Sequence, residues 1–309
     1  MNIYFAPLEG ITGYIYRNTY NMIYGHVDKY FAPFVSPSEK SPMTPRERKD
    51  IDPGNNAAIN LVPQILTNRS DCFIDAAKEL KSMGYSEINL NLGCPSGTVC
   101  AKGKGAAFLP ETIELKKFLD DIYNYAENNS TKISIKTRLG YYHPDEFYDL
   151  VKIFNEFPIC ELIIHPRIRS DFYKGDVRME YFTYALEHSN APLVYNGNIF
   201  TKDDYDKLPN KIDTVMLGRG LISDPSLADN LKGYATITDY KKFKELHDTL
   251  YHEYQKVMSP DINVLHKMRE LWSYWGVLFE GRERDIKKIL KAKKYKEYED
   301  AVAHVLKDF

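Results

Sequence analysis

The feature that most constrains the fold is a regular alternation, over the first 220 residues, of short apolar β-rich runs with segments of helical spacing. This alternation is typical of βα units around a parallel sheet. We predict strands near Ile3–Leu8, Tyr30–Val35, Asn60–Leu66, Glu87–Leu92, Lys132–Thr137, Leu162–His165, Leu193–Asn196 and Thr214–Leu217. Eight such strands predict an α/β protein with a (β/α)8 TIM barrel, and 309 residues suffice for one barrel and a smaller appendage.

The pattern changes after Asp224-Pro225 to longer stretches of helical spacing. These stretches predict helices over Tyr240–Val257, Val264–Leu278 and the lysine-rich segment Arg284–Leu306. We therefore expect a barrel domain over residues 1–235 and a small helical domain over residues 236–309.

Composition limits the cellular setting. Hydrophobic residues make up 43% of the chain and charged residues 27%, as in globular proteins. The N-terminal segment MNIYFAPLEG has no signal-peptide pattern, and no apolar stretch approaches the roughly 20 residues that span a bilayer. We expect a cytoplasmic protein with no membrane association and, since heptads are lacking, a monomer.

The four cysteines are too few and too scattered for a disulfide framework, and no His/Cys cluster has metal-ligand spacing. We expect no metal site and at least one free thiol. The net charge of −2 does not itself indicate a nucleic-acid partner. However, residues 240–309 carry 15 Lys and Arg against 12 Asp and Glu, so any RNA contact would depend on a local basic patch.

The most informative segment is NLGCPSGTVCAKGKGAAFL, residues 91–109, after the fourth predicted strand. In a barrel of this kind, functional groups lie at the C-terminal ends of strands. Cys94, between Gly93 and Pro95, is therefore placed to give or take a proton, although a buried free cysteine can also be a small hydrophobic residue. Cys100 lacks this setting and is expected to be a spectator.

Lys136 interrupts the end of the fifth predicted strand in ISIKTRLG. An unpaired buried ammonium is costly, so Lys136 should meet an anionic or electron-rich partner, either a ligand such as the flavin N1/C2-carbonyl edge or a barrel carboxylate. His165 ends the sixth predicted strand in IIHPR, where it could bind a ligand or be structural.

Glycine-rich turns follow the last two predicted strands, in VYNGN and VMLGRG. Barrel enzymes commonly bind phosphate at this position through backbone N–H groups. Arg219 would add charge-assisted hydrogen bonds, so the two turns indicate a cofactor that carries phosphate.

Together these segments resemble the tRNA-dihydrouridine synthase family in order and spacing, from APLEGIT (residues 6–12) through the GCP, K-x-R-x-G, H-x-R, NGN and GRG segments to the helical C-terminus. The resemblance implies FMN at the barrel mouth, NADPH as reductant and tRNA as substrate. It implies that Cys94 is the catalytic acid, which protonates uracil C5, and that Asn91 and Arg138 lie near the substrate base. The flavin-binding positions it implies are Pro7, Leu8, Glu9, Gln64, Lys136, His165, Asn196, Gly197, Asn198, Gly218 and Arg219.

Two alternatives remain open from the sequence. One is another FMN barrel acting on a small molecule, such as a dihydroorotate-type dehydrogenase. The other is an RNA-binding protein without chemistry, which would leave Cys94 and Lys136 without a purpose. The basic run of residues 287–296 is predicted either to contact RNA phosphates, with Tyr295 and Tyr298 interleaved, or to be a solvated helix face.

Overall fold

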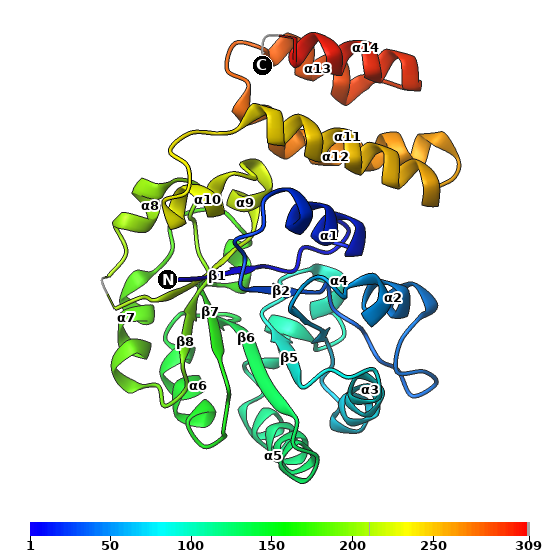
Figure 1. The fold of residues 1–309 in the computed structure, drawn as a ribbon. Coiled ribbons are helices and arrows are strands. Elements are labelled where there is room, and N and C mark those ends of the chain that lie inside the picture. Colours follow the sequence, from blue (N-terminus) through cyan, green and yellow to red (C-terminus); the bar gives the residue numbers. More distant parts are fainter. Residues whose placement is uncertain (210, 308–309) are drawn as a thin grey trace. The chain divides into compact units, whose positions relative to one another are not determined.

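The computed structural model describes residues 1–209 and 211–307, and its described residues contain one parallel sheet of nine strands. The strand order is β3-β2-β1-β9-β8-β7-β6-β5-β4 (Figure 1). The strands are β1 (Asn2–Phe5), β2 (Lys29–Phe31), β3 (Leu61–Val62), β4 (Gln64–Ile65), β5 (Glu87–Leu92), β6 (Lys132–Gly140), β7 (Leu162–Ile168), β8 (Leu193–Tyr195) and β9 (Thr214–Leu217).

The sheet closes into a barrel because β3 and β4 are two halves of one predicted strand, separated by Pro63. β3 pairs with β2, and β4 pairs with β5. Proline has no N–H to donate, which interrupts the ladder, but the Pro63 carbonyl accepts a 2.9 Å hydrogen bond from the Asn89 N–H. The predicted (β/α)8 barrel is confirmed, with its third strand split.

Two predicted strands end earlier than expected. β1 ends at Phe5 rather than Leu8, because Pro7 cannot donate to a ladder and the Leu8 N–H instead donates to Thr12 Oγ1 at 2.8 Å. β2 ends at Phe31, and Val35 forms only an isolated bridge with Ile65.

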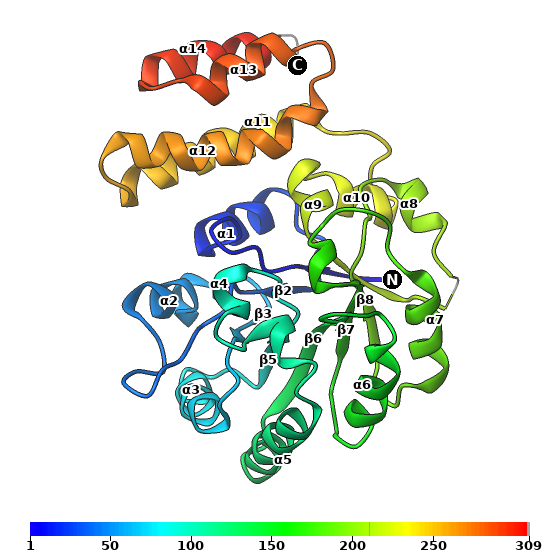
Figure 2. The same cartoon turned by 180° about the vertical axis from the view of Figure 1, so that it is seen from behind.

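Helices cover the outside of the strands, as Figures 1 and 2 show for α3, α5, α6 and α7. Helix α5 shows why these helices pack on the sheet. Its buried residues recur at the spacing of one helix face and include Leu115, Phe118, Leu119 and Ile122. The helices are α1 (Tyr14–Ile23), α2 (Pro45–Asp50), α3 (Ser70–Ser82), α4 (Gly97–Cys100), α5 (Thr112–Asn128), α6 (Glu146–Phe154), α7 (Met179–His188), α8 (Lys202–Asp206), α9 (Arg219–Ser223), α10 (Leu227–Lys232), α11 (Tyr240–Val257), α12 (Asp261–Trp275), α13 (Glu283–Lys291) and α14 (Tyr295–Val305).

The chain divides into two compact units. The first contains residues 1–7, 28–198 and 208–216, and therefore nearly the whole barrel sheet. The second contains residues 8–27, 199–207 and 217–309, so that α1 and α8–α10 belong to it together with the C-terminal helices. The predicted domain boundary after residue 235 stays a prediction.

The second unit corrects one expected helix. α11 has the predicted bounds, but the lysine-rich segment Arg284–Leu306 forms two helices, α13 and α14, rather than one. The chain turns at Ala292, whose buried side chain and carbonyl, a hydrogen-bond acceptor from Arg269 Nη1 at 3.4 Å, hold the break in place. Two short helices can each bury an apolar stripe on the bundle, which one straight helix could not.

A buried polar cluster lies in this bundle. Tyr298 is fully buried, and its hydroxyl accepts a 3.0 Å hydrogen bond from Trp272 Nε1 and lies 2.7 Å from His247 Nε2. The expectation that Tyr298 contacts RNA is therefore wrong, because its polar and aromatic atoms are used within the core.

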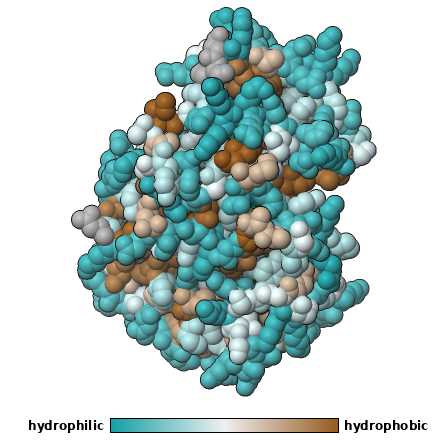
Figure 3. All heavy atoms as spheres, viewed as in Figure 1, coloured by the Kyte–Doolittle hydropathy of each residue, from teal (hydrophilic) through white to brown (hydrophobic). Residues whose placement is uncertain are grey.

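The outer surface is mainly hydrophilic, with scattered hydrophobic patches on the face shown in Figure 3. Within residues 1–209 and 211–307, no helix has both the length and the apolar character needed to cross a membrane.

Candidate active site at the barrel mouth

The C-terminal halves of β5, β6 and β7 bring most of the predicted polar residues together. In the ladder, Asn91 of β5 is the register partner of Lys136 in β6, and Arg138 of β6 is the partner of His165 in β7. Parallel strands align their C-terminal ends at one rim, so residues 45 or 27 positions apart become neighbours. This rim is the candidate active site.

A chain of hydrogen-bonded carboxamides runs through the barrel beneath the rim. Asn89 Nδ2 donates to Ser134 Oγ at 2.9 Å, and Gln64 Nε2 donates to Asn89 Oδ1 at 2.7 Å. Asn91 Nδ2 then donates to Gln64 Oε1 at 2.7 Å. Gln64 and Asn89 are fully buried, so each amide has the partner that burial requires.

The chain ends at the backbone of the Cys94 loop. Asn91 Oδ1 accepts hydrogen bonds from the Gly93 N–H at 3.1 Å and the Cys94 N–H at 2.9 Å. Both functional groups of Asn91 are thus engaged within the protein, and they fix the loop on which Cys94 stands.

Cys94 is half-buried, and burial is the largest effect on its thiol, raising the pKa above the ordinary value. Its carbonyl oxygen accepts hydrogen bonds from the Ala106 N–H at 3.1 Å and from the Cys100 thiol at 3.5 Å. Gly105 packs against it, because a Cβ there would lie 2.8 Å from the Cys94 carbonyl oxygen, and its φ of +62° also favours glycine. Cys94 is therefore a positioned, protonated thiol, and Cys100 supports its loop.

Lys136 is half-buried at the centre of the rim, and no hydrogen bond or ion pair to another residue of the described chain holds its amine. Burial lowers its pKa to about 7, with a smaller contribution from the Arg138 charge. The barrel carboxylate that could have paired with it is not there in residues 1–209 and 211–307. A positively charged group without a partner is costly, so the amine is suited to an electron-rich ligand.

Arg138 is buried, and its guanidinium donates hydrogen bonds to three backbone carbonyl groups. Nε donates to Gly93 at 2.9 Å, Nη1 to Ile168 at 2.8 Å and Nη2 to Phe172 at 2.7 Å. Burial lowers its pKa to about 10. Arg138 therefore ties the Cys94 loop to the loop that follows β7.

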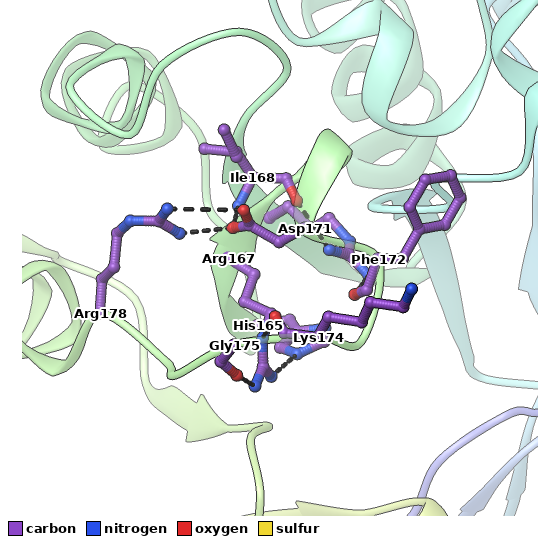
Figure 4. A network of polar contacts seen from close by, with 9 residues as sticks. His165, Arg167, Ile168, Asp171, Phe172, Lys174, Gly175 and Arg178 are labelled. Carbon is purple, nitrogen blue, oxygen red and sulfur yellow. Dashed lines mark hydrogen bonds and ion pairs between the residues drawn. The ribbon is translucent and has the colours of Figure 1, made fainter.

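His165 is buried within β7, which continues to Ile168 instead of ending at His165 as predicted, and its Nε2 lies 2.9 Å from Arg167 Nη1. Arg167 is fully buried and also donates from Nε to the Lys174 carbonyl at 3.2 Å and from Nη2 to the Gly175 carbonyl. Figure 4 shows this network holding the loop after β7 around His165.

Asn196, Gly197 and Asn198 follow β8. The buried Asn196 side chain donates from Nδ2 to the Met216 carbonyl at 2.8 Å, which joins the ends of β8 and β9. A Cβ at Gly197 would collide with the Tyr195 ring and hydroxyl, so this turn requires glycine. Pro7, half-buried, also belongs to the first compact unit.

The remaining predicted ligands, Leu8, Glu9, Gly218 and Arg219, belong to the second compact unit. There Glu9 is exposed, Gly218 precedes α9, and the Arg219 guanidinium lies 5.6 Å from the centre of the Phe200 ring. Their part in a cofactor site stays a prediction.

The residues of the first unit fit a flavin. A lysine amine without a protein partner suits the electron-rich edge of an isoalloxazine, and neighbouring carboxamide and imidazole groups supply further donors. In residues 1–209 and 211–307, no three His, Cys, Asp or Glu side chains are grouped as metal ligands.

Sequence reasoning missed three residues of the site, namely Asn89, Arg167 and Asp171. Asn89 lies inside an otherwise apolar strand, which is a signal for a buried polar contact. Asp171 forms an ion pair with Arg178 at 2.5 Å and accepts from the Ile168 N–H at 2.9 Å. No local pattern points to Asp171, since its partners are set by the folded loop.

Comparison with known proteins agrees with this geometry. A probable tRNA-dihydrouridine synthase of Staphylococcus epidermidis is 28% identical over 264 residues, which covers 81% of this chain and 78% of the relative. A tRNA-dihydrouridine(16) synthase of Aquipseudomonas alcaligenes is 28% identical over 235 residues and 74% of each chain. Among solved structures, morphinone reductase has a TM-score of 0.53 at 12% identity, covering 78% of this chain and 88% of that one, a similarity of fold alone. The family model for dihydrouridine synthase (Dus) matches residues 4–307, and the chain therefore belongs to the dihydrouridine synthase family.

Proposed function

We propose that this protein is a tRNA-dihydrouridine synthase, which reduces the C5–C6 double bond of specific uridines in tRNA with FMN and NADPH. The observation that carries the proposal is the Cys94 thiol, held by Asn91 on a rigid loop at the barrel mouth. Membership of the dihydrouridine synthase family and the names of both relatives support uridine in tRNA as the substrate. This substrate is consistent with the cytoplasmic location expected from the sequence.

Cys94 acts as the general acid. Because burial raises its pKa, the thiol keeps its proton at neutral pH and can donate it to uracil C5. FMN, reduced by NADPH, supplies the hydride for C6 when bound. The target base must leave its stack in the tRNA to reach this depth.

Lys136 is proposed to bind the electron-rich edge of the flavin ring, with Gln64 and His165 beside it. The Asn196–Asn198 turn of the first unit is proposed to bind the phosphate and Pro7 to contact the ring. For Leu8, Glu9, Gly218 and Arg219 of the second unit, flavin binding is proposed from the family resemblance alone. Asn91 and Arg138 are proposed to act near the substrate base by positioning the loops, since Asn91 Oδ1 and the Arg138 guanidinium both bind backbone groups.

The helical domain over residues 236–309 is proposed to bind the tRNA backbone. An open cleft of about 650 Å³ between α13 and α14 is lined by the basic residues Arg284, Lys287, Lys288 and Lys291, by His304, and by the acidic residues Glu297 and Asp300. Lys287 and Lys291 are exposed and have no ion pair among the described residues. Lys267 is less suited, because its amine binds the Gly10 carbonyl and Glu270.

The test is mass-spectrometric mapping of dihydrouridine in tRNA incubated with the purified protein and NADPH, after its visible spectrum has been recorded. A yellow protein that forms dihydrouridine at defined positions supports the proposal. A yellow protein that oxidises NADPH but leaves tRNA unchanged would favour a small-molecule substrate, and a colourless protein that binds tRNA would favour binding without chemistry.

A further inference from the structure

An exposed group of aromatic and basic side chains lies on the loops that follow β6 and β7. We call it the aromatic rim, and it consists of Tyr141, Tyr142, Arg169, Phe172 and Tyr173. The exposed fraction of the side chain is 63% for Tyr142, 42% for Phe172 and 50% for Tyr173. Large aromatic rings exposed to this extent, close together and beside a catalytic site, indicate a surface for a partner.

Four members of the aromatic rim contact one another in turn, whereas the centre of the Tyr173 ring lies 5.6 Å from the Arg138 guanidinium and 6.0 Å from the His165 ring centre. Tyr142 packs edge-on against Tyr141 with ring centres 4.7 Å apart. The Arg169 guanidinium lies 5.6 Å from the Tyr141 ring centre and 5.2 Å from that of Phe172. Arg169 Nε is buried and has no hydrogen-bond partner within the described chain, so the guanidinium has unused donor capacity.

Both loops are held rigidly. The Glu146 carboxylate accepts hydrogen bonds from the N–H groups of Tyr141 at 2.9 Å and Tyr142 at 2.8 Å. Asp171 and Arg178 clamp the other loop. Phe172 has a φ of 48°, a strained conformation for a bulky residue, and it is kept there by the bond from Arg138 to its carbonyl. The fold therefore keeps the exposed Phe172 ring in place in spite of the backbone strain at this residue.

Basic groups flank the aromatic residues on the loop after β7. Arg169 and the exposed Lys174 lie beside them, and Asp171 within segment 169–174 is paired with Arg178. On the loop after β6, the Glu146 carboxylate is engaged by the N–H groups of Tyr141 and Tyr142. Figure 4 shows the Phe172 ring and the Lys174 amine pointing to the same side of the loop, away from Arg178. Aromatic rings interleaved with basic groups are the usual surface for single-stranded nucleic acid.

The aromatic rim is coupled to the catalytic loop by one side chain. Arg138 donates to the carbonyl of Phe172 and also to that of Gly93, the residue before Cys94. Arg138 therefore fixes the position of the Phe172 loop of the aromatic rim relative to the Cys94 loop. A surface that holds nucleotides next to a reacting base needs such a fixed position.

We propose that the aromatic rim stacks on the unpaired bases that flank the target uridine in the RNA. This inference rests on the proposed function. Extrusion of a uridine unstacks its neighbours, and aromatic rings bind such bases whatever their sequence because every base has a π-face. Arg169 and Lys174 then contact the adjoining phosphates.

The experiment uses the full-length, FMN-loaded protein with Phe172→Ala and Tyr142→Ala. We expect KM for tRNA to rise by at least about fivefold for each, while kcat at saturating tRNA and the rate of flavin reduction by NADPH stay unchanged. Phe172→Tyr should restore KM. The control is Tyr148→Ala, on α6, whose side chain is 38% exposed and lies outside the rim; it should behave as wild type.

Two further measurements separate the possible failures. Phe172→Gly relieves the backbone strain, so it keeps the loop while losing the ring, and wild-type KM in this variant would overturn the inference. Binding of a single-stranded oligouridylate, measured by fluorescence anisotropy, needs no turnover. Suppose that the wild-type protein forms no dihydrouridine while Phe172→Ala still weakens oligouridylate binding at least about fivefold. That result would contradict the proposed function and support the aromatic rim as an RNA-binding surface. Equal oligouridylate affinity of the wild-type protein and Phe172→Ala would contradict the proposal that the aromatic rim binds RNA.

Discussion

Arg138 donates a 2.9 Å hydrogen bond from Nε to the carbonyl oxygen of Gly93, the residue immediately before Cys94. Together with the bonds from Asn91 to the N–H groups of Gly93 and Cys94, it fixes the peptide that carries the thiol from both sides. A reacting group loses little entropy when its backbone is already fixed in the folded protein.

Replacing Cys94 by alanine or serine should leave FMN content and NADPH oxidation unchanged and reduce dihydrouridine formation by about 10²- to 10⁴-fold, because the proton donor for C5 is lost or made far less acidic. The measurement is single-turnover reduction of tRNA by the pre-reduced enzyme. The control is Cys100→Ala, which removes a weak support of the same loop. Full activity of Cys94→Ala would eliminate the proposed acid.

Asn91→Ala should destabilise the protein by about 1–3 kcal/mol, because it leaves the buried Gln64 Oε1 and the half-buried Cys94 N–H without the hydrogen-bond partner that Asn91 supplies. Turnover should fall more than flavin binding, since the thiol loses its fixed position. Urea unfolding and tRNA reduction measure the two effects. The matched change Asn128→Ala, on the exposed end of α5, should alter neither by much.

Lys136 should make the stability of the cofactor-free protein depend on pH. Its pKa is lowered from 10.5 to about 7 by burial, so between these values the unfolded chain holds a proton that the folded protein has released. The free energy of unfolding therefore rises with pH between about 7 and 10.5. Below about pH 7 the folded protein carries the buried charge, and the destabilisation by that charge has its full value.

The corresponding variant is Lys136→Met. It should be more stable than the wild-type apoprotein near pH 7, and the difference should shrink as the pH rises toward 10, as followed by urea unfolding. Exposed Lys102→Met supplies the control. A stability difference that does not vary with pH would contradict the lowered pKa, and undiminished FMN binding by Lys136→Met would contradict its role toward the flavin.

Removing the two unpaired lysines of the α13–α14 cleft, Lys287→Ala with Lys291→Ala, should weaken tRNA binding and lower the slope of log affinity against log salt by about 2. Reduction of FMN by NADPH should not change. The matched double variant removes Lys78 and Lys152, which form surface ion pairs with Asp75 and Asp149. If the slope of log affinity against log salt does not change, these lysines do not contact RNA phosphates and belong to a solvated helix face.

The sequence by itself predicted the barrel and the approximate places of its strands, and it placed Lys136 and His165 on the fifth and sixth of them and Cys94 directly after the fourth. Those inferences depend on short-range patterns, because apolar periodicity and a polar residue at a strand end are visible within a few positions. It also predicted α11 with the bounds that the structure has.

Only the tertiary structure decided what these side chains touch. The binding of Arg138 to backbone, the bond from Asn91 to Gln64, the burial of Tyr298 and the turn at Ala292 all depend on partners 23 to 51 residues away. Long-range partners follow from barrel closure and helix packing, which set distances that no local pattern encodes. For the same reason only the structure showed that Arg138 binds the carbonyl groups of both the Cys94 loop and the Phe172 loop, and its place near the substrate base stays a prediction.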